Sequence, residues 1–492
     1  MSSDDHDAPG EADVGRRLPR APGARGPVSS PAASAADGAR ARRTTATLVS
    51  VVAGGAFLAP INSTMIAVAL PALGNEYGIG VADVAWLVIA YLLVMASLQP
   101  LAGRLGDSFG HRRLFVAGCV GLLAASVGCA LAPSFGLLLA CRALQGVAAA
   151  AMSPNGGAIL RHAVPADRQG QAFGWFAACL TLGAAIGPAL GGVLVDQFGA
   201  ASIFWVNLPV LALVVPLAVR LLPETPTHAA ARLDGIGAVL LTATLVGGSS
   251  ALVFARSAGA GITAALAAST VALAVAFAGW ERRHPRPLVD LRLFRHPAFS
   301  AASASVLLSN LMMYTTLLLV PLLLTQLQGR SAAHVGWVLV VFSGAMALVS
   351  PLGGRLSDEV GRAWPVVGGS ALLVAGAALL LGADAATSTA SLLTALVITG
   401  VGVGLQMGAQ QSAALESAPA SMAGVAGGVW ATSRYVGSIA GSAILAMLVR
   451  DRADVGEIHA VVIVILVAGL VLLPTGIVLR ASGRPLGLLR AD

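Results

Sequence analysis

The chain contains no lysine and few charged residues of any kind. Of its 492 residues, 11% are charged and 57% are hydrophobic, whereas soluble globular chains carry about 25% charged residues. Without lysine the chain cannot form a GxxxxGKS or GxxxxGKT phosphate-binding loop, which excludes a built-in ATP motor. The apolar excess predicts a protein that faces lipid along most of its length.

Residue clusters that carry metal chemistry are also missing. The sequence has no HExxH motif, no CxxC pair and no Cys/His cluster. Four cysteines lie in apolar runs, where we expect small packing residues: Cys119, Cys129, Cys141 and Cys179. We therefore expect a protein that is not an enzyme and that holds neither a cofactor nor a metal ion.

The net charge of +7 does not indicate nucleic-acid binding. All the basic residues are arginines, and they are scattered at the ends of apolar runs instead of lining one face. We expect no nucleic acid among the partners of this protein.

Fourteen apolar windows are long enough to cross a bilayer core of about 30 Å, which needs roughly twenty helical residues. These windows are 46–69, 82–103, 114–132, 135–158, 171–195, 203–222, 234–255, 261–280, 298–325, 334–353, 364–383, 389–413, 422–448 and 459–480. Residues 1–43 have no apolar period and are rich in Ala, Gly, Pro, Asp, Ser and Arg, which predicts a disordered tail.

Arginines gather in alternate loops between these windows. They are Arg104, Arg112, Arg113, Arg161, Arg168, Arg282, Arg283, Arg286, Arg292, Arg295, Arg355 and Arg362. The positive-inside rule places these loops in the cytoplasm, although Arg450 and Arg452 weaken the pattern before the last window. An even number of spans then puts both termini in the cytoplasm, in a multi-pass protein of the inner or plasma membrane.

One loop sequence occurs twice. The stretch GRLGDSFGHRR (103–113) follows the second window, and GRLSDEVGR (354–362) follows the tenth. This pattern resembles the loop signature of the major facilitator superfamily, in which it follows the second helix of each six-helix half. Here two additional windows, the seventh and eighth, separate the repeats, which resembles the fourteen-helix drug:proton antiporter branch of that superfamily.

The resemblance implies an all-α polytopic fold of two six-helix bundles with two inserted helices. Residues 44–222 would form the first bundle and 297–482 the second, with the two extra helices and a cytoplasmic linker in 223–296. Cytoplasmic tails would occupy 1–43 and 483–492. Further motifs similar to those of this branch are LACRALQG (139–146), GAAIGPALGG (183–192), FWVNLP (204–209) and RLDG (232–235).

Two arginines lie well inside windows, away from the window ends. Arg142 is in the fourth, where a guanidinium costs about 2.5 to 3.5 kcal/mol and must face protein or water. With Gln145 one turn away, the RxxQG-like pattern implies a role in substrate or proton movement; a snorkelling or structural arginine is the alternative. Arg434 in the thirteenth window is a second candidate for transport, or its side chain reaches the lipid headgroups.

The fifth window and the loop repeats are candidates for moving parts. The exporter-like signature supplies a hinge made of Gly183, Gly187, Pro188, Gly191 and Gly192, for which ordinary small-residue packing is the alternative. A conformational gate is predicted at the loop repeats, with interfacial anchoring as the alternative. Its residues are Gly103, Arg104, Asp107, Gly110, Arg112, Arg355, Asp358, Gly361 and Arg362.

The first window departs from the family pattern. Members often carry an acid where this chain has Asn62, and an amide cannot titrate. No Asp or Glu in the middle of a window replaces it; Asp234 and Glu416, at window ends, are the nearest candidates. Asn62 is kept as a candidate transport residue, and proton coupling is what the resemblance implies.

The resemblance places a central cavity between the first, fourth, ninth and twelfth windows. Residues there that suit an amphipathic ligand are Asn310, Met313, Tyr314, Gln406 and Gln410, although packing alone would explain any one of them. The expected function is proton-coupled export of drugs, antibiotics or other amphipathic small molecules by alternating access. The alternative is a non-pumping membrane sensor or accessory protein with the same fold. We expect a monomer in the lipid bilayer.

Overall fold

The computed structural model describes residues 46–482 except 166–167, 226–233, 256–257, 286, 419–421 and 450–452. The predicted tails, and the first two residues of the RLDG motif, lie outside the described residues. Residues 45–492 form one compact unit. The predicted boundaries between two bundles and an insertion stay a prediction.

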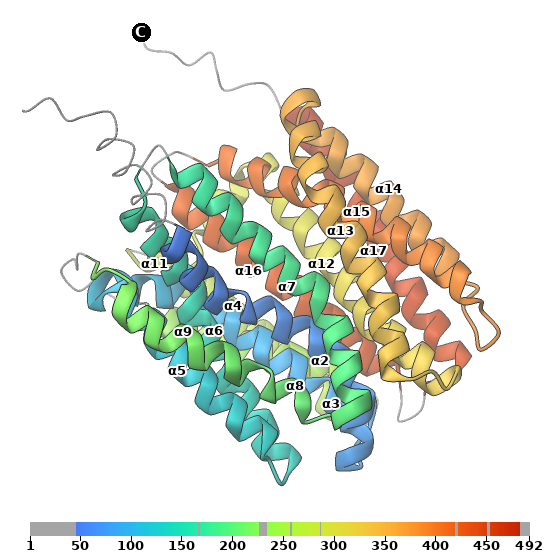
Figure 1. The fold of residues 1–492 in the computed structure, drawn as a ribbon. Helices are drawn as coiled ribbons and strands as arrows, with labels where there is room; N and C mark the ends of the chain where they lie inside the picture. Colours follow the sequence, from blue (N-terminus) through green and yellow to red (C-terminus); the bar gives the residue numbers. More distant parts are fainter. Residues whose placement is uncertain are drawn as a thin grey trace, which may run out of the picture. The chain divides into compact units, whose positions relative to one another are not determined.

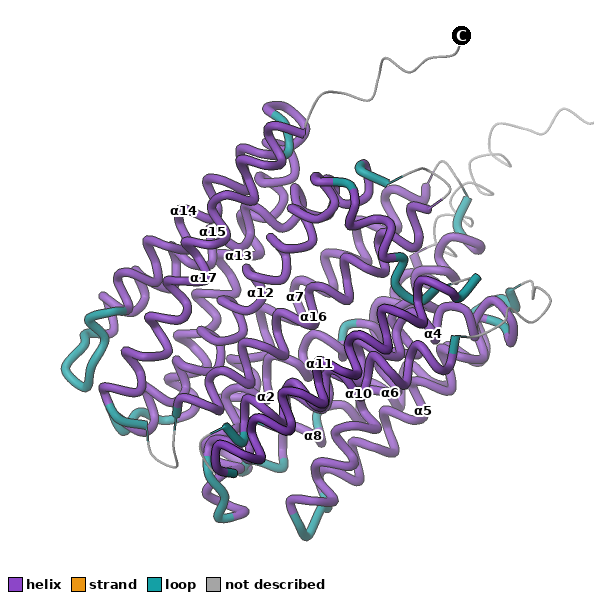
Figure 2. The backbone as a smooth tube through the Cα atoms, turned by 180° about the vertical axis from the view of Figure 1, so that it is seen from behind, coloured by secondary structure: helices purple, strands orange, loops and turns teal. Residues whose placement is uncertain are grey.

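Every regular element in the described part is helical, with no strand (Figure 2). The first elements are α2 (Leu58–Tyr77), α3 (Val81–Val84), α4 (Trp86–Phe109), α5 (His111–Ala130), α6 (Phe135–Ala163), α7 (Gln169–Phe198), α8 (Ser202–Trp205) and α9 (Asn207–Leu221). After them come α10 (Gly235–Val253), α11 (Gly259–Arg283) and a short 3₁₀ turn, η2 (Leu291–Arg295). The last are α12 (Pro297–Leu322), the π-helical η3 (Leu323–Leu327), α13 (Ala332–Val360), α14 (Ala363–Leu380), α15 (Thr389–Glu416), α16 (Ala423–Leu448) and α17 (Val455–Ser482).

Thirteen helices in the described residues are long and apolar enough to cross a membrane. The predicted span 422–448 is the exception: α16 is 26 residues long, but its composition is too polar to meet the same criterion. Arg434 and several hydroxyl residues lower its mean hydropathy. Because α16 packs against α12 and α4, these polar groups are shielded from lipid. With α16 the helices match the fourteen predicted spans.

The two loop repeats form the same turn. Gly110 ends α4 with a φ of 95°, and Gly361 ends α13 with a φ of 90°. These positive values favour glycine, which explains why both copies of the motif carry it at this position. The repeats therefore join α4 to α5 and α13 to α14 by equivalent turns.

The earlier helices and the later helices form two packed groups, which contact each other through a small number of helix pairs. Helices α4, α5, α6 and α9 pack together, as do α12, α14, α15 and α17 (Figure 1). Contacts between the two groups run through α7 with α13, α4 with α16 and α2 with α12. The inserted helices α10 and α11 pack against each other, and α10 also contacts α4 and α16. The most apolar stretch of α11 has no residue buried in the protein, as expected for a lipid-facing helix.

Candidate functional site

Arg142 of α6 is buried in the protein interior, with 1% of its side chain exposed. Its Nε donates to Leu87 O at 3.2 Å, and its Nη1 donates to Gln145 Oε1 at 2.8 Å. The guanidinium lies 4.7 Å from the centroid of the Tyr91 ring. Its Nη2 has no hydrogen-bond partner. A cation in the membrane interior thus keeps one donor available.

Hydrogen bonds continue from Arg142 through four helices. Gln145 donates to Ser126 Oγ of α5 at 2.9 Å, and Asn207 of α9 donates to the same oxygen at 3.0 Å. Asn207 also donates to Asn62 Oδ1 of α2 at 3.0 Å. We call this chain, Arg142–Gln145–Ser126–Asn207–Asn62, the polar chain. It joins α6, α5, α9 and α2 through buried side chains.

Asn62 and Asn207 pair reciprocally at the end of the polar chain. Asn62 Nδ2 donates to Asn207 Oδ1 at 2.9 Å and to Leu58 O at 2.8 Å, while Asn207 returns a hydrogen bond to Asn62 Oδ1. Both amides are buried and fully engaged. At the position where relatives are expected to carry an acid, this chain therefore has a structural amide pair.

The predicted cavity residues lie in the interior of the later helices. Gln410 of α15 donates to Ser305 Oγ at 2.7 Å and to Gln406 Oε1 at 3.0 Å, whereas Gln406 Nε2 has no partner. Asn310 donates to Val306 O of its own helix α12 at 3.0 Å. Asn310, Tyr314, Gln406 and Gln410 are buried in the protein, and Met313 is half-buried. Their role in substrate contact stays a prediction.

A hydroxyl pair joins the two groups of helices near Arg142 and Arg434. Tyr314 Oη of α12 lies 2.5 Å from Ser63 Oγ of α2. Arg142 and Arg434 are both electrostatic neighbours of Tyr314. Met313, the residue before Tyr314, packs against the main hydrophobic core. The structure thus brings the two predicted arginines to the same region.

Arg434 of α16 is surrounded by aromatic rings. Its guanidinium lies 5.0 Å from the Tyr435 ring centroid and 5.9 Å from that of Trp430, and its Nη2 donates to Tyr435 Oη at 3.3 Å. Its Nε and the Trp430 Nε1 have no hydrogen-bond partner. Arg434 is half-buried, and its role in transport stays a prediction.

The glycines predicted as a hinge pack α7 against two helices. On one face, a Cβ added to Gly183 would lie 2.9 Å from Phe57, and one added to Gly191 would lie 2.5 Å from Met65, both in the first span. A Cβ added to Gly187 would likewise collide with Thr64 of α2. On the other face, a Cβ added to Gly192 would collide with the backbone of Ala332 at the start of α13.

The contact between α7 and α13 includes Pro188 and a carboxylate cap. A Cβ added to Gly336 of α13 would lie 2.5 Å from Pro188 O. Asp196, near the end of α7, accepts hydrogen bonds from Ala332 N at 2.9 Å and Ala333 N at 2.8 Å. It therefore caps the N-terminus of α13, which stabilises the helix dipole.

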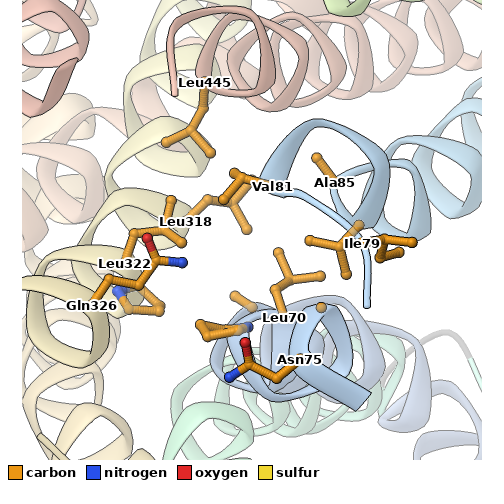
Figure 3. A pocket seen from close by; sticks show the side chains of 14 residues that line it. Leu70, Asn75, Ile79, Val81, Ala85, Leu318, Leu322, Gln326 and Leu445 are labelled. Atoms are coloured by element: carbon orange, nitrogen blue, oxygen red, sulfur yellow. The ribbon is translucent and has the colours of Figure 1, made fainter. Parts of the chain in front are cut away.

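A small cavity lies at the same end of the helices as Asp196, away from the arginine-rich loops. Its volume is about 30 Å³, and its lining comes from the ends of α2, α3, α12 and α16 (Figure 3). Leu70 and Val81 face Leu318 and Leu322 across it, with the amides of Asn75 and Gln326 at one side. This space fits about one water molecule. The early and late helices therefore both line this narrow space.

The first loop repeat forms an ion-pair network within the early helices. Asp107 lies 3.2 Å from His111 Nε2, and His111 Nδ1 lies 2.7 Å from Asn155 Oδ1 of α6. Arg112 Nη1 lies 2.6 Å from Glu224 Oε1, which follows α9. Arg104 Nη2 donates to Pro287 O at 2.9 Å, in the segment before α12.

The second loop repeat forms a similar network around Arg362. Its Nη1 contacts Asp358 at 2.5 Å and Ser357 Oγ at 3.0 Å, and its Nε donates to Glu416 Oε2 at 3.0 Å. The hydrogen bond to Glu416, followed by that to Asp358, raises the pKa of Arg362 above its ordinary value. Arg355 is exposed, and Gly103 lies next to Pro154 of α6. A gating role for both networks stays a prediction.

The chain matches known proteins over most of its length. The family model described as Major Facilitator Superfamily matches residues 52–442 and 302–485. The "Uncharacterized MFS-type transporter YvkA" of Bacillus subtilis (strain 168) is 39% identical over 83% of this chain and 91% of that protein. "Multidrug resistance protein Stp" of Mycobacterium tuberculosis (strain CDC 1551 / Oshkosh) is 34% identical over 80% of this chain and 73% of its own.

Further matches concern an export protein and a solved structure. The "Tetracenomycin C resistance and export protein" of Streptomyces glaucescens is 32% identical over 83% of this chain and 76% of its own. Among solved structures, a POT family transporter in complex with 5-aminolevulinic acid superposes with a TM-score of 0.67 at 16% identity. The match covers 90% of this chain and 97% of the chain in that structure, which shows a common fold.

The reciprocal amide pair predicts how the protein tolerates an acid at position 62. In Asn62→Asp, an ionised carboxylate would face Asn207 Oδ1 without a donor, so only the protonated acid restores the pair. We expect a loss of about 1–3 kcal/mol in unfolding free energy at alkaline pH, largely recovered at mildly acidic pH. Thermal unfolding in detergent at several pH values measures this. Asn75→Asp, at an exposed position on the same helix, is the control, and equal behaviour of both variants would contradict the pairing.

The close approach of α7 and α13 predicts different effects for two glycines of α13. Gly336→Leu would push against Pro188 O and should cost about 1–3 kcal/mol in stability. Gly344→Leu should have little effect, because nothing lies within 4 Å of its added Cβ. Melting temperatures in detergent compare the two variants, and an equal loss in both would rule out a specific contact at Gly336.

Proposed function

Because the chain belongs to the Major Facilitator Superfamily, we propose that this membrane transporter exports drugs, antibiotics or other amphipathic small molecules by alternating access, with protons as the coupling ion. The names of two relatives support the direction and substrate class. One is called a multidrug resistance protein and the other a resistance and export protein for tetracenomycin C. We further propose that the protein works as a monomer in the plasma membrane.

Two arginines suggest which substrates the transporter takes: Arg142 is buried and Arg434 is half-buried. Arg142 Nη2 and Arg434 Nε are buried donors without acceptors, and both arginines lie near Tyr314. A buried unsatisfied donor costs about 1–3 kcal/mol, more when it is charged, so a ligand acceptor placed there gains that energy. Among the described residues, the electrostatic neighbours of Arg142 are Cys129, Tyr91 and Tyr314, none of which is a carboxylate. This observation favours neutral or anionic substrates that present carbonyl, phenolate or carboxylate oxygens.

Alternating access requires contacts that close one end and open the other. We propose that the arginine-rich loops face the cytoplasm and that the described conformation is closed on the opposite side, where Asp196 caps α13. The glycine contacts of α7 with α2 and α13 would then be the hinge. Breaking the networks at Asp107 and Arg362 would accompany the change of state.

One observation supports the alternative, which is a membrane sensor that has the transporter fold but does not pump. Asn62 is not an acid, and its pairing with Asn207 fills the position completely. Such a sensor would bind ligands near Arg142 without net flux. Export and sensing are therefore distinguished by measuring binding and flux on the same preparation.

Efflux from vesicles tests the proposed function. With an imposed pH gradient, the wild type should move an anionic, carbonyl-rich fluorescent compound faster than a cationic dye, and an uncoupler should stop it. Arg142→Gln should lower this transport by about 10-fold or more, because a hydrogen bond to a charged group contributes about 1.5–3 kcal/mol. Arg220→Gln, which removes an exposed arginine of α9, should leave transport unchanged. Binding without flux would favour the sensor, and equal transport by both variants would contradict a role for Arg142.

A further inference from the structure

Two buried carboxyl groups meet where the inserted helices begin and end. Asp234 precedes α10 and has 1% of its side chain exposed; Glu281, near the end of α11, has 3% exposed. Asp234 Oδ1 accepts from Gly237 N and from Trp280 Nε1, both at 2.8 Å. Glu281 Oε2 accepts from Val289 N at 2.9 Å. One oxygen of each carboxyl group is thus held in place by fixed donors.

The other oxygen of each group faces its neighbour. Asp234 Oδ2 and Glu281 Oε1 are buried and receive no hydrogen bond from any donor in the described residues. Both lie against Gly237, and a Cβ added there would be 2.6 Å from Glu281 Oε1. The same added Cβ would be even closer to Asp234 Oδ2, so the two oxygens lie close together beside Gly237. Two ionised carboxylates in this position would repel and leave both oxygens without a donor.

We propose that Asp234 and Glu281 form a proton-binding site, in which one proton is shared between Asp234 Oδ2 and Glu281 Oε1. The shared proton supplies the donor that both oxygens lack and reduces two buried negative charges to one. The site belongs to the inserted helices and is separate from the polar chain, so it does not depend on the proposed coupling or substrate.

The surroundings of the pair favour a single proton over a metal ion. Among the described residues, no group of three or more His, Cys, Asp or Glu side chains could hold a metal. His284 Nδ1 lies 3.6 Å from Asp234 Oδ2, and its ring stacks on Trp280. Arg104 of α4 donates to Pro287 O in the same segment. His284 is therefore a titratable neighbour of the remaining negative charge.

The shared proton connects the inserted helices to the segment that leads into α12. Glu281 holds Val289 N, and Arg104 of α4 holds Pro287 O two residues earlier. If the pair loses its proton, the Asp234 carboxylate repels the carboxylate of Glu281, the side chain that fixes this segment. The state of the proton thus controls how firmly the linker is attached to α11, the helix that carries Glu281.

Infrared spectroscopy of the purified full-length protein tests the site directly. At neutral pH we expect one protonated carboxyl C=O band, which shifts in heavy water and is lost in both Glu281→Gln and Asp234→Asn. Asp454→Asn, which alters an exposed carboxylate that caps α17, should keep the band. A band of equal intensity in wild type and both pair variants would overturn the proposal. A band that appears in the wild type only after alkali cations are removed would instead indicate a cation site.

The dependence of stability on pH provides a second test. Above a pH of about 4, the separated carboxyl groups of the unfolded chain have released the proton that the native pair still holds. Wild-type stability should therefore fall as the pH rises from there until the native pair ionises. Glu281→Gln should remove this decrease, because its amide N–H supplies the missing donor at every pH. If the stability of Glu281→Gln falls as much as that of the wild type, the shared proton is contradicted. If the stability of neither protein falls, the native pair holds no extra proton.

Discussion

Polar groups inside these helices must find partners within the protein, because the bilayer interior offers none. The polar chain from Arg142 to Asn62 meets this requirement for α2, α5, α6 and α9 together. Moving any of these helices alone would leave a buried donor or acceptor unpaired, at about 1–3 kcal/mol each. The early helices are therefore held as one rigid group, and the buried cation at Arg142 is placed by that group.

Contacts between the early and late helices are of a different kind. Apart from the pair of Ser63 with Tyr314 and the cap by Asp196, they consist largely of close backbone approach at glycines, as at Gly192 and Gly336. Such contacts are short-ranged and weakly directional, so they can be exchanged for others without leaving many polar groups unpaired. A rigid interior next to an exchangeable interface is what a two-state transporter requires.

Local patterns in the sequence predicted the spans, the repeated turns at Gly110 and Gly361, and the contact between Arg142 and Gln145 one turn apart. They could not predict pairings between distant segments, because helix periodicity shows which face is buried but not what it meets. Asn207 was part of a quoted motif, yet its partner Asn62 lies 145 residues earlier. Asp234 was noted without Glu281 for the same reason. The bundle boundaries and the gate remain predictions.

The polarity of α16 has a consequence for how the chain enters the membrane during synthesis. A segment carrying Arg434 partitions poorly into lipid by itself, since an arginine at the centre of a span opposes insertion by about 2.5 to 3.5 kcal/mol. The aromatic rings around that arginine come from its own helix, but its shielding comes from α12 and α4, which are synthesised earlier. Integration of α16 is thus assisted by helices already in place, so biogenesis of the late helices is cooperative and ordered from the N-terminus.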